Sequence, residues 1–294
     1  MSIRPSRCPI EGLGNDGRAR MHEQVELFNA FFAAGDPVVV ATVTGFLFLL
    51  GACAASFSCL VAFRLARLPE DRPLIAAIST PPSSCDHCGR RLSMLDLVPV
   101  LGWLAARGRC RGCGGNVPAR YPALEAAMGL VCAAAPFVFG GLTAQCFAAV
   151  FVACTAFLAA AIDWENGLVP EEVTWTLLFS GLLASPFVTD VWSRAAGAAL
   201  GAILVWVSMA LIGWWKRIDT RAVGDVAMGA AGGAWLGLQP VSWWLFAACF
   251  VHVAICVLAA SEDEEGMTWL PFGPALMGVL PVALAASPWI ATPG

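Results

Sequence analysis

Long apolar runs, broken by short polar or Gly- and Pro-containing turns, make up most of this chain. A membrane-spanning helix needs about 20 mostly apolar residues, and eight segments approach that length. They are residues 37–62, 122–140, 143–162, 173–189, 195–215, 224–238, 241–260 and 271–290. The pattern predicts an all-α polytopic integral membrane protein with about eight transmembrane helices.

Two polar stretches interrupt this pattern and divide the chain. A polar, loosely ordered N-terminal tail is expected over residues 1–36, before a first span at 37–62. A longer polar segment covers 63–121, and a seven-span membrane core is expected over 122–294. The segment 63–121 carries nine arginines: Arg64, Arg67, Arg72, Arg90, Arg91, Arg107, Arg109, Arg111 and Arg120. Because basic loops stay in the cytoplasm, this loop is predicted to face the cytoplasm.

Composition agrees with a membrane protein and says little about partners. Of 294 residues, 59% are hydrophobic and only 13% charged, whereas about a quarter of the residues of a soluble domain are charged. The net charge of -4 is unevenly distributed and therefore uninformative. No cleavable signal peptide is expected in the first 30 residues. Anionic lipid headgroups and the loop's topology account for its arginines, so membrane lipids are expected as partners and nucleic acid is not.

Four of the twelve cysteines form a pattern. Cys85 and Cys88 make one Cys-x-x-Cys pair, and Cys110 and Cys113 make a second after 21 intervening residues. This spacing is close to that of a four-thiolate zinc site, and four thiolates form a closed, structural shell. A redox dithiol or a disulfide pair is the alternative, although a cytoplasmic location disfavours stable disulfides.

Two aspartates lie at the edges of apolar runs, where an acid is costly. Asp163 ends AAFLAAAID, and Asp225 lies in RAVGDVAMGAAGGAWLG. The predicted topology places both at cytoplasmic helix ends, 62 residues apart in sequence. If they approach each other, one carboxyl would keep a proton while the other is ionised, which is the arrangement of an aspartyl protease. The alternative is that each aspartate is only a helix-end residue at the level of the headgroups.

Several motifs together resemble those of the type IV prepilin peptidases, which are intramembrane aspartyl proteases of the Gly-x-Gly-Asp type. CDHCGRRL, LVPVLGWLAARGRCRGCGG and ARYPALEA resemble the family's cysteine-bearing cytoplasmic loop. AAIDWENGLVPEEVT and VGDVAMGAAGGAWLG resemble its two aspartate motifs, and WLPFGPAL resembles a further segment near the last span.

The resemblance implies a bifunctional enzyme of the bacterial inner membrane. Such an enzyme cuts the leader from prepilins or pseudopilins of type IV pili and type II secretion systems at the cytoplasmic face. It then transfers a methyl group from S-adenosylmethionine to the new N-terminal residue. In the family the two aspartates, here Asp163 and Asp225, carry proteolysis, and the cysteine loop is associated with methyl transfer.

The chain departs from the family pattern near its second aspartate. Ala222 replaces the first glycine, and Ala227 stands where lysine is usual. Losing a cation two residues from Asp225 alters the electrostatics of that carboxyl. Two other functions therefore stay open. One is a membrane thiol oxidoreductase that uses the two Cys pairs. The other is a non-catalytic assembly factor that binds prepilins without processing them.

Overall fold

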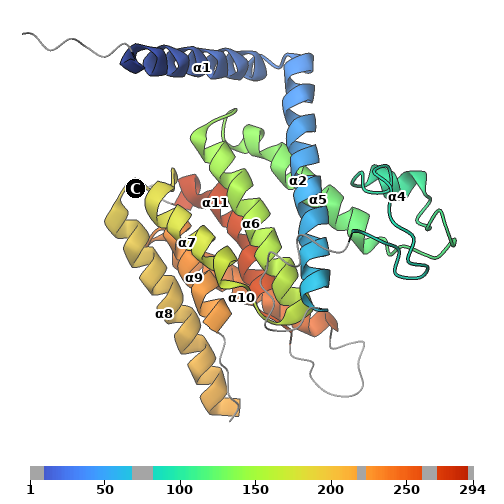
Figure 1. The fold of residues 1–294 in the computed structure, drawn as a ribbon. Coiled ribbons are helices and arrows are strands. Elements are labelled where there is room, and N and C mark those ends of the chain that lie inside the picture. Colours follow the sequence, from blue (N-terminus) through green and yellow to red (C-terminus); the bar gives the residue numbers. More distant parts are fainter. Residues whose placement is uncertain (1–9, 68–81, 217–222, 260–269, 291–294) are drawn as a thin grey trace, which may run out of the picture.

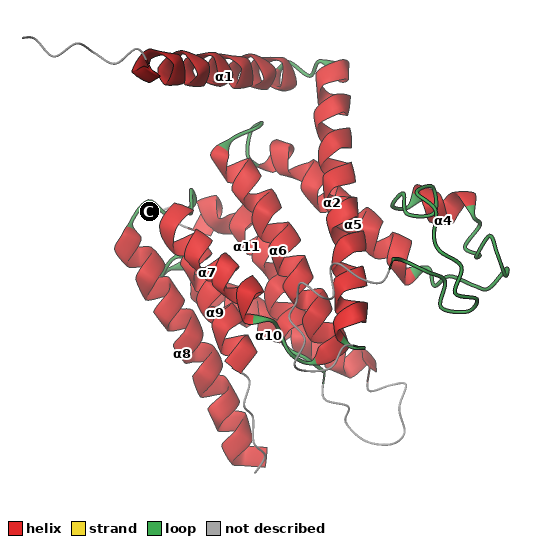
Figure 2. Ribbon diagram, in the orientation of Figure 1, coloured by secondary structure: helices red, strands yellow, loops and turns green. Residues whose placement is uncertain are grey.

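The computed structural model describes residues 10–67, 82–216, 223–259 and 270–290, and this part of the chain is helical with no strand. The helices are α1 (Ile10–Ala33), α2 (Pro37–Leu65), α4 (Leu101–Ala105), α5 (Arg120–Val138), α6 (Ala144–Asn166), α7 (Glu171–Ala184), α8 (Val191–Lys216), α9 (Val223–Leu236), α10 (Pro240–Ala259) and α11 (Gly273–Ile290). Figure 2 shows the same view by type of structure, with the loop around α4 set apart from the helical bundle.

Each of the eight apolar segments predicted from sequence contains a helix, but eight spans are not confirmed. Five helices are long and apolar enough to cross a membrane: Pro37–Leu65, Arg120–Val138, Ala144–Asn166, Val191–Leu211 and Pro240–Leu258. Helices α7 and α9 have only 14 residues each. At 1.5 Å per residue they rise about 21 Å, which is less than the roughly 30 Å of a bilayer core. Helix α11 is apolar over the shorter stretch Gly273–Ser287.

Local signals in the sequence explain where the long helices begin and end. Asp36 caps α2, because its Oδ1 accepts hydrogen bonds from the N–H groups of Val38 (2.9 Å) and Val39 (3.1 Å). Thr143 caps α6 by accepting from the N–H of Cys146 at 3.1 Å. Gly167 ends α6 with a left-handed φ of 66°, a conformation that glycine adopts without penalty.

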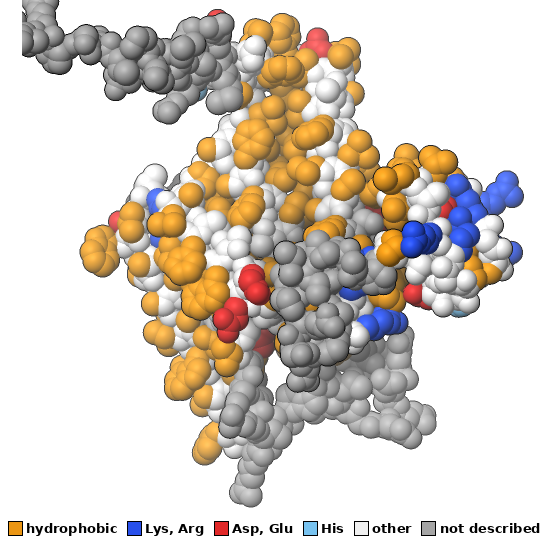
Figure 3. All heavy atoms as spheres, in the orientation of Figure 1, with side chains coloured by type: hydrophobic (Ala, Val, Ile, Leu, Met, Phe, Trp, Pro, Cys, Tyr) orange, Lys and Arg blue, Asp and Glu red, His pale blue; other side chains and the backbone are white. Residues whose placement is uncertain are grey.

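Helix α6 packs against α2, α5, α7 and α11 (Figure 1), and glycines set how closely neighbouring helices approach. Helix α2 lies against α5 where Gly51 faces Met128 and Cys132. Helices α8 and α9 meet at two Gly-x-x-x-Gly pairs, Gly197/Gly201 and Gly229/Gly233, which allow backbones to come into contact. The main buried cluster joins α6, α7, α9, α10 and α11 and includes Ile162, Leu177, Met228, Trp244 and Leu276. Outward-facing apolar side chains cover much of the bundle (Figure 3), as a lipid-facing surface requires.

The expected loosely ordered tail is instead helical over Ile10–Ala33. In Figure 1, α1 lies crosswise at the beginning of α2. Two contacts hold its C-terminal part against the bundle. The Oδ1 of Asn29 accepts from the N–H of Leu142 at 2.7 Å, and the rings of Phe32 and Phe137 lie 5.1 Å apart. These contacts with α5 and the turn that follows it join positions far apart in sequence, so no local pattern predicts them.

Candidate active site and metal centre

The C-terminal end of α6 carries Asp163 in a fixed and buried place. Its side chain is 5% exposed, although it lies only three residues from the end of the helix. Asn166 ties this helix end to α2, because its Nδ2 donates to the backbone oxygens of Ala62 (3.2 Å) and Ile162 (2.9 Å). The carboxylate itself accepts a hydrogen bond from the N–H of Gly273 at 3.0 Å. Asp163 is therefore built into the packing of the bundle and does not face solvent.

Asp225 lies in the first turn of α9 and is half-buried. Its carboxyl group interacts electrostatically with that of Asp163. The helix backbone is also close to the loop after α6, since a side chain added at Gly224 would lie 3.8 Å from the N atom of Val169. The structure thus brings together the two aspartates that the sequence singled out. Ala227 is half-buried in the same helix, while Ala222 and Arg221 lie outside the described residues.

The four cysteines of the loop converge on one point. Their Sγ atoms all lie within 4.8 Å of one another, with 3.9 Å between those of Cys85 and Cys113 and 4.0 Å between those of Cys88 and Cys110. A tetrahedral ion with metal–sulfur bonds of about 2.3 Å has sulfur–sulfur edges of about 3.8 Å. The donor set and its dimensions therefore fit a metal ion, and none of the four forms a disulfide.

Two matching turns present these thiols. In the first, Gly89 has a φ of 68° and its N–H donates to the oxygen of Cys85 at 2.9 Å; in the second, Gly114 has a φ of 72° and its N–H donates to the oxygen of Cys110 at 2.9 Å. Backbone N–H groups of Cys113 and Gly112 lower the pKa of the Cys110 thiol to about 6. This favours the thiolate, which is the form that binds metals.

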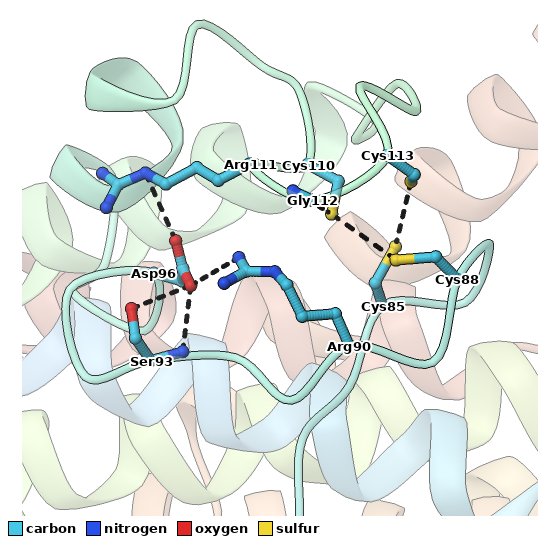
Figure 4. A network of polar contacts seen from close by, with 9 residues as sticks. All are labelled: Cys85, Cys88, Arg90, Ser93, Asp96, Cys110, Arg111, Gly112 and Cys113. Carbon is cyan, nitrogen blue, oxygen red and sulfur yellow. Dashed lines mark hydrogen bonds and ion pairs between the residues drawn. The ribbon is translucent and has the colours of Figure 1, made fainter.

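A polar network supports the cysteine site from one side (Figure 4). Asp96 accepts from the Nη2 of Arg90 at 2.8 Å and from the N–H and Oγ of Ser93 at 2.9 and 2.8 Å. Its other oxygen pairs with the Nε of Arg111 at 3.4 Å. The Nε of Arg90 is buried and has no hydrogen-bond partner among the described residues, while the guanidinium interacts with Cys110. Four thiolates around a divalent ion carry a net charge of -2, which would satisfy this buried donor.

Glu125 connects the cysteine loop to the membrane bundle. Glu125 and Arg120 both belong to α5, and they have different partners. The Oε2 of Glu125, a buried residue of α5, accepts from the N–H of Val100 at 2.7 Å. Arg120 instead pairs with Glu165, at 3.8 Å, two residues after Asp163. The loop and the aspartate end of α6 thus both contact the beginning of α5.

Charge is concentrated on the loop. Figure 3 shows the basic side chains gathered around the segment that contains α4, while the visible helix faces are mostly apolar. Exposed Met94, Leu95, Leu101 and Leu104 accompany them. A surface of arginines and apolar side chains next to the bundle is typical of a segment that lies near lipid headgroups.

Two family models match the parts of the chain that contain these two sites. The family model described as "Bacterial Peptidase A24 N-terminal domain" matches residues 49–139, and the one described as "Type IV leader peptidase family" matches residues 150–257. A relative from Dickeya chrysanthemi, named prepilin leader peptidase/N-methyltransferase, is 37% identical over 71% of this chain and 75% of its own length. The chain belongs to the type IV leader peptidase family.

Other members of this family show the same extent of similarity. Proteins with the same name from Burkholderia pseudomallei and Aeromonas hydrophila are 36% and 31% identical over 68% of this chain. The match spans 65% of the length of the Burkholderia protein and 69% of that from Aeromonas. No solved structure matches the chain. The four cysteines of the loop lie within the first matched range, 49–139, and both aspartates lie within the second, 150–257.

Proposed function

We propose that this chain removes the leader peptide from prepilins or pseudopilins and then methylates the new N-terminus. One observation carries the proteolytic part. Asp163 and Asp225 come from separate motifs, and their carboxyl groups are close enough to interact electrostatically, with that of Asp163 held at the start of α11. The names of the relatives, prepilin leader peptidase/N-methyltransferase, supply the substrate class and the second activity.

The pair provides the groups that peptide hydrolysis needs. One carboxylate takes a proton from a water molecule, whose oxygen attacks the carbonyl carbon, while the protonated carboxyl of the partner donates to the carbonyl oxygen. Collapse of the tetrahedral species breaks the C–N bond, and the leaving amine takes up a proton. The products are a leader with a new carboxylate and a pilin with a free N-terminal amine. The two aspartates act as one titrating unit.

The methyl transfer uses that new amine. S-adenosylmethionine would supply the methyl group, which passes to the amine nitrogen with loss of a proton. The four-cysteine site would hold zinc as a structural ion through Cys85, Cys88, Cys110 and Cys113. Zinc would provide folding free energy to a segment without a core, since the buried residues of 82–119 are Gly102, Gly108 and Cys110. This role leaves no open coordination position for a reaction.

Charge supports a cytoplasmic position for both sites. The basic loop follows α2 and precedes α5, and the ends of α2 and α6 that lie nearest to it are joined by Asn166. If the arginines keep this loop in the cytoplasm, the aspartate end of α6 faces the same side. The enzyme would then be a multi-pass protein of the bacterial inner membrane that meets the charged leader of its substrate in the cytoplasm.

The test compares aspartate variants of the full chain in detergent. Asp163→Asn and Asp225→Asn should each lower the rate of leader cleavage by about 10²–10⁴-fold, because an amide neither accepts nor delivers the proton. Mass spectrometry of a cognate prepilin, with and without S-adenosylmethionine, measures leader loss and the added methyl separately. Asp190→Asn is the matched control, because Asp190 caps α8 and asparagine caps helices equally well.

Each outcome decides between the candidate functions. Undiminished cleavage by both single variants would rule out aspartyl proteolysis. A folded native protein that binds prepilin and leaves it intact would favour the non-catalytic assembly factor. Reversible disulfide formation within the pair Cys85 and Cys88 or the pair Cys110 and Cys113 in the metal-free protein, with no cleavage, would favour the thiol oxidoreductase.

A further inference from the structure

The start of α11 contacts the aspartate site although it lies outside the ranges that the family models match. Gly273 is 110 residues from Asp163 in sequence, and its backbone N–H donates to the Oδ2 of that aspartate at 3.0 Å, in a buried position. Among the described residues this is the one hydrogen bond to the Asp163 side chain. It therefore determines how the carboxylate is oriented.

The absence of a side chain at Gly273 is required by this contact. A Cβ at this position would collide with the Oδ2 of Asp163 and would lie 2.9 Å from its Cγ and 2.7 Å from the Cε of Met228. Met228 is 1% exposed and lies three residues after Asp225 on α9. Gly273 thus fills the narrow space between the helix that carries Asp163 and the helix that carries Asp225. Any larger residue must displace one of them.

Contacts with α10 keep the backbone of Gly273 in place. The ring of Phe272, the preceding residue, packs edge-on against the ring of His252 with centroids 5.1 Å apart. One turn further along α11, the oxygen of Leu276 accepts from the Nε1 of Trp244 at 3.0 Å. Trp244 is 1% exposed. Because α10 contacts α11 on both sides of Gly273, the direction of the Gly273 N–H is fixed.

We propose that Gly273 is a positioning residue of the peptidase: its N–H holds Oδ2 of Asp163, and its lack of a side chain lets the carboxylate lie against α11. The proposal rests on the proposed function of the aspartate pair. With Oδ2 held by Gly273, Oδ1 is the oxygen left to act on water or to share a proton with Asp225. Displacement of a reacting group by about 1 Å can lower a rate about 10²-fold, so this orientation matters for catalysis.

Two alanine variants of the same helix test the role in catalysis. Gly273→Ala should lower kcat for leader cleavage by about 10²-fold and leave KM nearly unchanged, because the added Cβ displaces the reacting carboxylate and the change removes no side chain that could bind the leader. Gly278→Ala is the matched control, since a Cβ there meets nothing within 4 Å. Native kcat in Gly273→Ala, or an equal loss in Gly278→Ala, would overturn the proposal.

A stability cycle tests the contact without any substrate. Gly273→Ala should lower the Tm of the native chain in detergent, and it should lower the Tm less in an Asp163→Ala background, where the carboxylate no longer occupies the space. An equal decrease in both backgrounds would contradict direct contact. If the proposed function is wrong, the native protein will not cut prepilin even though the cycle shows coupling between Gly273 and Asp163. The two failures can therefore be told apart.

Discussion

Asp96 holds the cysteine loop together with both of its oxygens. One oxygen accepts from Arg90 and Ser93, and the other pairs with Arg111. This side chain, only 9% exposed, therefore joins the segment after the first Cys pair to the second Cys pair. The N–H of Ser93 and then its hydroxyl and Arg90 lower the pKa of this carboxyl below its ordinary value of 3.8. The network acts on Cys110 through Arg90 and so helps to orient a metal ligand.

Asp96→Asn should weaken metal binding by about 10–100-fold, the usual effect of losing a partner that supports a ligand. Because the folded-state pKa is lowered, the contribution of the carboxylate is complete above about pH 4 and is lost only as the pH falls through the folded value. The ratio of affinities between native and variant chains should therefore be the same at pH 6 and pH 8. Competition with a chromogenic zinc chelator measures it.

Asp86→Asn is the matched control for this prediction, because Asp86 lies in the same loop and is exposed. It should leave zinc affinity near that of the native chain. A ratio for Asp96→Asn that falls between pH 8 and pH 6 would show that the carboxylate is not ionised throughout this range and would contradict the network described above.

At the level of elements, the contact between α8 and α9 is set by four glycines. A Cβ at Gly233 would collide with the oxygen of Gly197, and one at Gly201 would collide with the oxygen of Gly229. In a bilayer such close contact replaces the hydrophobic driving force that helices lack among lipid tails. Since α9 begins two residues before Asp225, this contact also places the second aspartate.

Gly233→Ala should destabilise the folded chain by about 1–3 kcal/mol, the usual cost of overpacking. The backbone of α8 cannot yield as a flexible side chain would. Thermal unfolding in detergent provides the measurement. Gly45→Ala, in the middle of α2 with nothing within 4 Å of an added Cβ, should be neutral or slightly stabilising. Equal Tm values for the two variants would mean that α8 and α9 do not touch as described.

At the level of the whole molecule, two modules share few contacts. The membrane bundle has a continuous buried cluster, whereas the cysteine loop has none and joins the bundle through the bond from Val100 to Glu125. A metal ion in the cysteine cluster and packing within the membrane bundle would thus stabilise different parts of the chain. Loss of the ion should affect the loop first.

A strong chelator should make residues 82–119 sensitive to limited proteolysis and leave the Tm of the bundle nearly unchanged, because the loop depends on the metal for its folding free energy. We expect leader cleavage to persist and methyl transfer to fall, with recovery on addition of zinc. Loss of both activities at the same chelator concentration would show that the loop also shapes the aspartate site.

The length of the apolar runs predicted the helices, and the spacing of the cysteines predicted their site, because both depend on residues close together in sequence. Each apolar segment contains a helix, and the two Cys pairs converge as their spacing indicated. Neighbouring residues in the sequence do not predict which helices are shorter than a bilayer core. They also do not predict that Glu125 accepts a hydrogen bond from Val100 and not from Arg120. The Gly273–Asp163 bond joins positions 110 residues apart. The resemblance singled out the segment WLPFGPAL, which contains Gly273, but it did not identify Asp163 as the partner of this glycine. The catalytic role of the aspartates stays a prediction until the variants are measured.

The shortness of α7 bears on how water reaches a protease inside a membrane. The whole helix rises about 21 Å, roughly 9 Å less than an ordinary bilayer core, and its exposed side chains include Trp175, Phe179 and Leu183. If lipid borders this helix, the acyl chains beside it would compress or tilt, and the headgroups with their hydration would follow them inward. A bilayer that is thinner at this place would let bulk water reach the ends of the short helices. Beside a full-length span, the same depth would be filled by acyl chains. Substrate hydrolysis would then need no separate channel, only the mismatch between this helix and its lipids.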